Sequence, residues 1–182
     1  MMTDTVRIMT LLIKEDVDME QNEILWAKTN PNAIIPSKRD EDAGYDIYAC
    51  FEEDSIIIPK HSTYLIPTGI ATAFNPLYYM QIEERGSTGS KGIKVSSGII
   101  DSGYRGEWFI AITNSNDMDL VIAKKLESYE LYKNIIIYPY HKAIAQAIVH
   151  RVHSMKCKEV DYETLKSIKS ERGVGKIGAS EK

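Results

Sequence analysis

The sequence predicts a single all-β domain of the sandwich, jelly-roll or barrel kind, and three observations support this. Between Ser55 and Glu84, short runs of β-branched and aromatic residues are separated by proline, glycine and asparagine, a pattern typical of successive strands. No segment in this region has a helical period long enough to compete. The 182 residues, 43% of them hydrophobic, suffice for one buried core and are few for two domains.

The overall charge argues against some classes of partner. The formal net charge is −4, so an anionic ligand must be met by local cations or by a metal ion rather than by the protein as a whole. The longest apolar runs are far shorter than a membrane span, and the N-terminus lacks a basic segment followed by a long apolar core. We therefore expect a cytoplasmic protein without membrane contact and without direct nucleic-acid binding.

The first half of the chain divides into an extension and a series of strands. Residues 1–22 combine a short apolar patch with an acidic run, and we interpret them as an N-terminal extension of a β domain over residues 23–160. Strands are expected at Glu23–Lys28 and at Ala43–Ala49. The runs between Ser55 and Glu84 predict further strands arranged as a meander.

Charged residues precede and enter the second of these strands. Lys38–Asp42 is a charge cluster, which predicts a solvated loop. Asp46, within the strand, has two interpretations. It could position a hydrated Mg²⁺, because divalent cations bound to phosphates often contact protein through few carboxylates, or it could be a solvated charge at the edge of the strand.

The stretch Glu84–Asn114 gathers the residues best suited to chemistry. Its first part, Arg85–Gly92, has three glycines, three side-chain hydroxyls and two cations in eight residues. Such a composition lets backbone N–H groups converge on an anion while arginine and lysine supply charge, so this part is a candidate phosphate cradle. It lacks the Walker sequence and is not expected to open a helix.

The next part, Ser96–Gly106, predicts a tight hairpin that presents one carboxylate and one phenol. Asp101 could accept a proton from water if it faces a cleft, or it could cap the turn. Tyr104 could contact a ligand or cover the edge of the core. The following residues, Glu107–Asn114, predict a strand with alternating faces that anchors the hairpin from behind.

The C-terminal third is less regular. Asn116–Lys133 predicts a strand followed by either a helical turn or a charged loop, and further strands are expected at Ile135–Tyr138 and Ala143–Val152. A helical turn over Asp161–Ile168 should be capped by its first residue. The remaining segment, Glu171–Lys182, is glycine-rich and basic, which suits either a disordered tail or an arm that orders on an anion.

Five segments of the chain resemble, in order, the five motifs of the trimeric dUTP pyrophosphatase (dUTPase) family. They are Ala43–Ala49 (AGYDIYA), Glu84–Ile93 (ERGSTGSKGI), Gly98–Asn114 (GIIDSGYRGEWFIAITN), Ala143–Val149 (AIAQAIV) and Arg172–Ser180 (RGVGKIGAS). The resemblance implies a jelly-roll-like distorted β-barrel and a homotrimer whose active sites lie at subunit interfaces. It also implies that residues 161–182 form an arm that reaches over a neighbour's site.

The resemblance further implies Mg²⁺-dependent hydrolysis of dUTP to dUMP and pyrophosphate, which limits uracil incorporation into DNA and supplies dUMP. By this resemblance Asp101 is the general base that activates the water attacking the α-phosphorus. Asp46 holds the Mg²⁺ through coordinated water, and Gln146 hydrogen-bonds near the α-phosphate. Tyr104 packs beneath the deoxyribose and excludes a 2′-hydroxyl.

The remaining substrate contacts implied by the family divide by the part of the nucleotide that they hold. Arg85, Gly86 and Ser87 contact phosphate oxygens. Backbone groups of Ser97, Gly98 and Ile100 read the edge of the uracil. From the arm, Arg172 clamps the γ-phosphate, Ile177 covers the uracil and Ser180 assists.

Three positions depart from the family's usual motifs. The second motif usually begins Pro-Arg-Ser, whereas here Glu84-Arg85-Gly86 moves the hydroxyl one residue on, to Ser87. The fourth usually opens with glycine, an acid and a base, where this chain has His141-Lys142-Ala143. The fifth usually carries a phenylalanine that stacks on uracil, and Ile177 occupies that place.

Two alternatives stay open at this point. A dCTP deaminase relative would share the fold, but it needs a glutamate where this chain has Ala111. The other alternative is a trimer that acts mainly as a nucleotide-responsive regulatory or binding protein. Its contact surface would be residues 116–134, a segment that is longer than in compact members of the family.

Overall fold

The computed structural model describes residues 22–129 and 134–174, in two compact units, Met1–Val152 and His153–Lys182. The expected N-terminal extension lies outside the described residues, except for Asn22. The end of the expected charged loop before Ile135 and the last eight residues lie outside them as well. Each unit is described here by itself.

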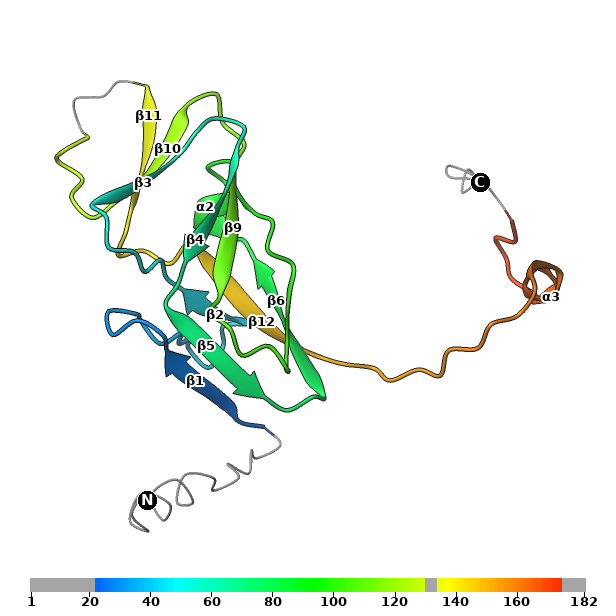
Figure 1. Ribbon diagram of the computed structural model, residues 1–182. Helices are drawn as coiled ribbons and strands as arrows, with labels where there is room; N and C mark the ends of the chain where they lie inside the picture. The colour runs from blue at the N-terminus through cyan, green and yellow to red at the C-terminus, as the bar shows by residue number, and fades with distance from the viewer. Residues whose placement is uncertain (1–21, 130–133, 175–182) are drawn as a thin grey trace, which may run out of the picture. The chain divides into compact units, whose positions relative to one another are not determined.

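The described part of the first unit contains twelve strands and one short helix (Figure 1). The helix, α2, covers Gly86–Gly89. The strands are β1 (Ile24–Lys28), β2 (Gly44–Ile47), β3 (Ser55–Ile58), β4 (Thr63–Pro67), β5 (Ile70–Phe74), β6 (Tyr78–Glu83), β7 (Ile93–Val95), β8 (Ile99–Asp101), β9 (Phe109–Asn114), β10 (Asp119–Ala123), β11 (Ile135–Pro139) and β12 (Ala145–Arg151). The all-β, jelly-roll-like class predicted from the sequence is confirmed.

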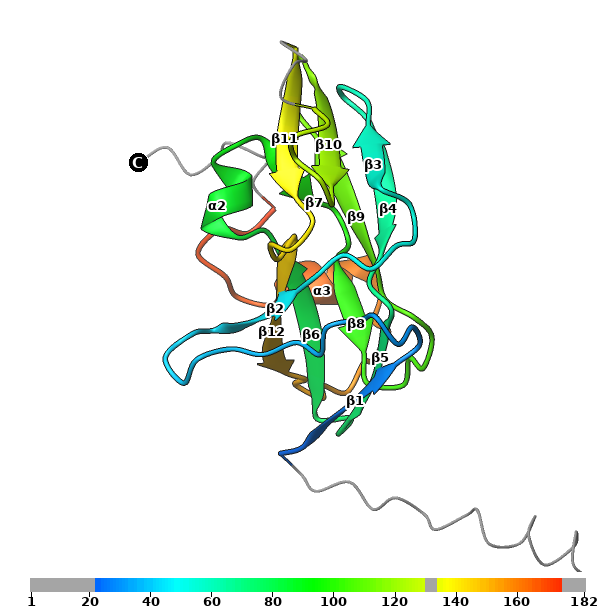
Figure 2. The ribbon, with the colours of Figure 1, turned by 90° about the vertical axis from the view of Figure 1, so that its left-hand side faces the viewer.

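The strands form four small sheets with long-range pairing. A four-stranded sheet has the order β2-β12-β6-β8, and two three-stranded sheets have the orders β4-β9-β7 and β11-β10-β3. The fourth sheet pairs β1 with β5. Figure 2 shows β12, β6 and β8 side by side in the four-stranded sheet.

The predicted meander is wrong, because β3, β4, β5 and β6 do not pair with one another. The link between β4 and β5 explains why. Although it has only two residues, Thr68 Oγ1 donates to the carbonyl of Trp108 (2.6 Å) and the Gly69 N–H donates to Glu107 Oε1 (2.9 Å). The link is thus bonded to the segment before β9, and the two strands leave it for different sheets.

The core lies between the inner faces of these sheets. In β9 and the residue before it, Trp108, Ile110 and Ile112 are fully buried, whereas Phe109 is 45% exposed. This confirms the alternation predicted for Glu107–Asn114. In β6, Met80 and Ile82 are buried on the same principle, so the opposite face of β6 is left for polar residues.

The second unit contains α3, which covers Tyr162–Ser167. The predicted cap is confirmed, because the Thr164 N–H donates to Asp161 Oδ1 at 2.8 Å. None of the residues of α3 is buried. Among the described residues, no helix is both long enough and apolar enough to cross a membrane.

The left-handed backbone at Gly69 generates a stability prediction. Its φ is +65°, and a Cβ there would lie 2.9 Å from the Cβ atoms of Ala33 and Asn30. Gly69→Ala should therefore lower the free energy of unfolding, measured in urea, by about 2–4 kcal/mol, from backbone strain and overpacking. Gly103→Ala is the control, because a Cβ at Gly103 meets nothing within 4 Å. Equal loss in both variants would contradict the packing described here.

Candidate active site

The first unit has an open, polar cavity of about 620 Å³, which we call the cradle pocket. One wall is the loop from Ser37 to Ala43, and the other is α2 with Arg85 before it. Asp46 on β2 and Gln146 on β12 face each other across these two paired strands and also line the cavity. Three of the five motif segments therefore supply residues to one cavity.

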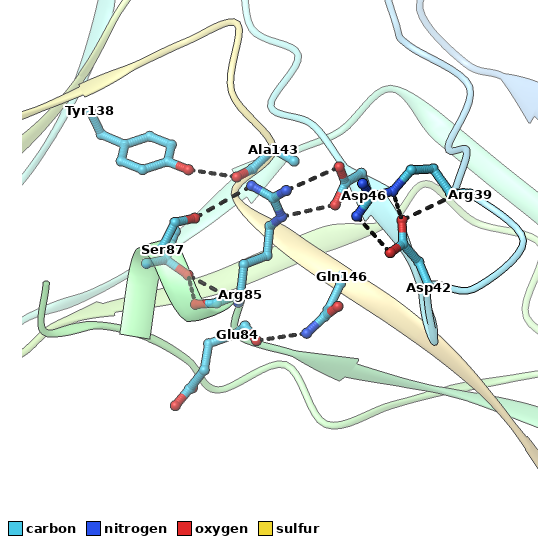
Figure 3. Close-up of polar contacts among 10 residues, drawn as sticks. Arg39, Asp42, Asp46, Glu84, Arg85, Ser87, Tyr138, Ala143 and Gln146 are labelled. Atoms are coloured by element: carbon cyan, nitrogen blue, oxygen red, sulfur yellow. Dashed lines mark hydrogen bonds and ion pairs between the residues drawn. The ribbon is translucent and has the colours of Figure 1, made fainter. Parts of the chain in front are cut away.

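Arg85 and Asp46, which both line this pocket, form a two-point ion pair (Figure 3). Arg85 Nε lies 2.8 Å from Asp46 Oδ1, and Nη2 donates to Oδ2 at 3.2 Å. Each side chain is 32% exposed, so a ligand entering the pocket can reach both. The arginine expected to bind phosphate and the carboxylate expected to hold the metal are thus paired with each other in this state. Asp46 lies on an edge strand and is partly exposed, but it is ion-paired and not merely solvated.

The segment after Arg85 forms a helical turn, so the expectation that it opens no helix is wrong. The cause is Thr88, which is fully buried. Its Oγ1 accepts from the Arg85 N–H (3.1 Å) and donates to the Arg85 carbonyl (2.9 Å), which closes the turn. Ser87 stays exposed and lies 3.5 Å from Arg85 Nη1. The structure therefore places the hydroxyl of Ser87, and not that of Thr88, at the pocket.

Glu84, noted above only because it departs from the family's second motif, holds the residues around the cradle pocket in place. Its backbone carbonyl accepts from Gln146 Nε2 at 3.0 Å, which fixes that amide (Figure 3). Its carboxylate accepts from the Val95 N–H at 3.3 Å and from Lys94 Nζ at 3.2 Å. The Val95 N–H first, and then Lys94, lower the pKa of Glu84 below its ordinary value.

Tyr138, on β11, lies beneath the same cradle and was not predicted as a site residue. It is 3% exposed, and its hydroxyl donates to the Ala143 carbonyl at 2.6 Å. Burial raises the pKa of Tyr138, while the nearby Arg85 and Ser87 oppose that rise. Sequence reasoning missed Tyr138 because only the fold brings it close to Arg85 and Ser87, which lie far from it along the chain.

Asp101 and Tyr104 line a second cavity of about 250 Å³ at the edge of the four-stranded sheet. The predicted turn is present, since the Tyr104 N–H donates to the Asp101 carbonyl at 3.1 Å. The predicted hairpin around it is wrong: β8 pairs with β6, whereas β9 pairs with β4 and β7. The turn therefore joins two sheets.

The carboxylate of Asp101 is exposed, and within residues 22–129 and 134–174 it has no hydrogen-bond or ion-pair partner. The turn is held by the backbone carbonyl of Asp101, so its side chain does not act as the cap. This leaves the carboxylate available to a ligand or to water.

Tyr104 is held in place by its own turn. Its hydroxyl donates to the Glu107 carbonyl at 2.9 Å, and its ring is 45% exposed. The ring lies so close over Gly106 that a Cβ there would be 2.5 Å from the Tyr104 hydroxyl oxygen. Only glycine fits at this position without displacing the ring.

The residues expected to read uracil lie at β8 and just before it. The Ser97 hydroxyl accepts from the Ala111 N–H at 2.7 Å, and the Gly98 carbonyl accepts from the Ile82 N–H at 2.9 Å. Ser97 therefore braces the strand with its side chain. Because β8, which includes Ile100, is at the edge of its sheet, its outer backbone groups remain free of strand pairing.

The two cavities are separated by β6. Asp101 lies opposite Tyr79 on this strand, and Gln146 lies opposite Glu83. Since these partners are four residues apart, with β6 between β8 and β12, the backbones of Asp101 and Gln146 are roughly 16 Å apart, from a rise of ~3.3 Å per residue and a spacing of ~4.8 Å between strands. Both side chains leave the same face of the sheet, so within one chain they do not converge.

The remaining predicted residues belong to the second unit. Arg172 is exposed and follows α3, and its role at the site stays a prediction. Ile177 and Ser180 lie outside the described residues. In the part of the chain that the structure describes, no group of three or more histidine, cysteine, aspartate or glutamate side chains could hold a metal ion.

The described residues thus combine an all-β fold, a cationic cradle on one cavity and an exposed carboxylate beside a tyrosine on another. Comparison with known families gives the class of protein. The family model described as dUTPase matches residues 30–126, which is more than half of the chain. The chain belongs to the dUTPase family.

Similar proteins agree with this assignment. A deoxyuridine 5′-triphosphate nucleotidohydrolase of Clostridioides difficile is 32% identical over 157 residues, covering 84% of this chain and 94% of that protein. One from Leptospira interrogans is 35% identical over 104 residues, covering 55% of this chain and 71% of that protein. The Pol polyprotein of ovine maedi visna related virus is 36% identical over 108 residues, which are 59% of this chain and 10% of the polyprotein.

Solved structures share the fold. The dUTPase of equine infectious anemia virus has a TM-score of 0.56 and 26% identity, covering 77% of this chain and 98% of that one. The dUTPase of Staphylococcus bacteriophage 80alpha, solved with dUpNHpp, has a TM-score of 0.68 and 21% identity, covering 88% of this chain and 99% of that one. At that identity the second likeness shows the fold alone.

The lowered pKa of Glu84 generates a prediction about acid stability. A carboxyl whose pKa is lower in the folded state stabilises the fold above its ordinary pKa of 4.5, and this stabilisation is lost as the pH falls through the lowered value. Urea unfolding from pH 7 to pH 3 should therefore show Glu84→Gln less stable than the wild type at neutral pH, with the difference shrinking below pH 4.5. A difference that is constant over this range would contradict the stabilisation of the ionised Glu84 carboxylate by the Val95 and Lys94 contacts.

Proposed function

We propose that this protein hydrolyses dUTP to dUMP and pyrophosphate, by attack of water on the α-phosphorus. Family membership and the names of the relatives support the enzyme class, a dUTP diphosphatase. The observation that carries the mechanism is the pairing of two half-sites on one fold, a phosphate cradle at Arg85 and a free carboxylate at Asp101. Hydrolysis of dUTP would limit uracil incorporation into DNA and supply dUMP.

The cradle pocket binds the triphosphate. Arg85 presents a planar fork suited to phosphate oxygens, and the exposed Ser87 hydroxyl and the backbone of Gly86 lie beside it. Binding exchanges partners, since phosphate oxygens take the Arg85 guanidinium and free the Asp46 carboxylate. Gln146, fixed by the Glu84 carbonyl, is pre-oriented to hydrogen-bond near the α-phosphate.

The residues of the pocket fit Mg²⁺ only as a hydrated ion carried by the triphosphate. Asp46 is the carboxylate beside Arg85, and within the described residues no cluster of three acidic or histidine side chains supports a protein-held ion. Asp46 would hold the ion through water, which matches the preference of Mg²⁺ for retaining its waters. When bound, the ion neutralises phosphate charge and favours departure of pyrophosphate.

Asp101 acts as general base. It takes a proton from the attacking water as the new bond to the α-phosphorus forms and the bond to the bridging oxygen of the β-phosphate breaks. The absence of any side-chain partner in the described part of the chain supports this role, because no competing contact needs to be broken. Phosphoryl transfer of this kind depends mainly on positioning and charge neutralisation.

Selectivity comes from the second cavity. Tyr104, held over Gly106, lies beneath the deoxyribose and leaves no room for a 2′-hydroxyl. The outer edge of β8, from Ser97 to Ile100, offers backbone donors and acceptors to the uracil, which excludes cytosine by pattern and thymine by its methyl group.

A complete site requires more than one copy of the chain. The separation of roughly 16 Å between the backbones of Asp101 and Gln146 supports an assembly in which one copy supplies the cradle and another supplies the base. We propose a homotrimer with three such sites. Residues 161–182 would act as an arm over residues 23–160 of a neighbour, with Arg172 on the γ-phosphate, Ile177 over the uracil and Ser180 assisting.

The role of Asp101 can be tested by substitution. Asp101→Asn keeps the size of the side chain and removes its basicity, so kcat for pyrophosphate release from dUTP should fall by about 10²–10⁴-fold while KM changes little. Parallel assays with UTP, dCTP and dTTP should give far slower release by the wild type. A wild type that is inactive on dUTP with Mg²⁺ would refute the function, and an Asp101→Asn variant with unchanged turnover would refute the mechanism.

A further inference from the structure

The loop wall of the cradle pocket carries cations that none of the five motif segments includes. Lys38 and Arg39 lie between Ser37 and Asp42, all four of which line the cavity. The sequence predicted a solvated loop here, and both side chains are exposed. The structure adds that this solvated loop faces the phosphate cradle.

Arg39 is bound to one carboxylate and close to a second. Its Nε and Nη2 donate to the two carboxylate oxygens of Asp42 at 2.8 and 2.9 Å. The Asp42 contact raises the pKa of Arg39, and the charge of Asp46 adds to this. In Figure 3 the Arg39 guanidinium lies on one side of Asp46 and that of Arg85 on the other.

The charges of the pocket suit a ligand with more negative charge than one arginine can neutralise. Arg85 already shares its charge with Asp46. In the Arg39–Asp42 pair the arginine side chain is 87% accessible and that of the aspartate 35%, so exchanging the carboxylate for another anion costs little. Lys38 differs, since its Nζ donates to the Arg39 carbonyl at 3.2 Å and lies 5.7 Å from the centre of the Tyr45 ring.

We propose that Arg39 is a second phosphate-binding residue of the cradle. When the nucleotide binds, Arg39 releases Asp42 and binds terminal phosphate oxygens instead. The proposal rests on the proposed function, because it takes a nucleoside triphosphate as the ligand. The exchange is favourable because a phosphate accepts the same two-point contact that Asp42 accepts and carries more charge. Arg39 thus adds binding from the body of the subunit, independently of the arm.

Three variants separate this role from its alternatives. Arg39→Met removes the cation. Lys38→Met removes a neighbouring cation of the same loop and so controls for general electrostatics. Asp42→Asn breaks the ion pair but keeps an oxygen that can accept from the Arg39 N–H, so it controls for a role in shaping the loop.

The expected results concern binding more than turnover. Arg39→Met should weaken the binding of inorganic tripolyphosphate with Mg²⁺, measured by calorimetry, about tenfold, and raise KM for dUTP by a similar factor with kcat nearly unchanged. Lys38→Met should change both by less than about threefold. Asp42→Asn should bind tripolyphosphate as tightly as the wild type or more tightly. Melting temperature and assembly state should match the wild type in all three.

Several outcomes would overturn the proposal. The proposal fails if Arg39→Met binds tripolyphosphate as tightly as the wild type does. It also fails if Lys38→Met loses as much affinity for tripolyphosphate as Arg39→Met. A loss in Asp42→Asn equal to that in Arg39→Met would make Arg39 a structural residue of the loop. Failure of the proposed function looks different, because the wild type would then bind tripolyphosphate in an Arg39-dependent way without releasing pyrophosphate from dUTP.

Discussion

The ion pair between Arg85 and Asp46 is the contact on which the rest of the site depends. It joins β2 to the turn of helix after β6, and the buried hydroxyl of Thr88 holds that turn in place. Around it, the Glu84 carbonyl fixes Gln146 and the buried Tyr138 lies underneath. A pocket built this way keeps its arginine in place before a ligand arrives, and an incoming phosphate needs only to exchange one anion for another.

The second constraint is distance. Strand pairing fixes Asp101 and Gln146 on opposite sides of β6, four residues apart along it, and neither side chain can cross that gap. If Asp101 is the base for a phosphate held in the cradle, as we propose, the two can meet only when more than one chain assembles. On this view the exposed carboxylate of Asp101 and the open cradle pocket of one chain belong to two different sites. A neighbouring chain completes each of them.

Sequence reasoning predicted the strands and the family better than the connections between strands. Runs such as Glu107–Asn114 carry their burial pattern in alternating residues, and the motif segments around Asp46, Arg85, Asp101 and Gln146 could be recognised by their order. The meander and the hairpin were wrong because strand pairing depends on long-range contacts, such as those of Thr68 with Trp108. Tyr138 and Arg39 were missed for the same reason, since only the fold brings them to the cradle.

Subunit complementation tests the shared site most directly. Arg85→Ala damages only the cradle and Asp101→Asn only the base, so each variant alone should be nearly inactive. When the two are unfolded, mixed in equal amounts and refolded, random trimers should regain roughly a quarter of the wild-type pyrophosphate release from dUTP, because that fraction of sites pairs an intact cradle with an intact base from another chain. Mixed trimers that form, as judged by mass, and stay as inactive as either parent would contradict the account.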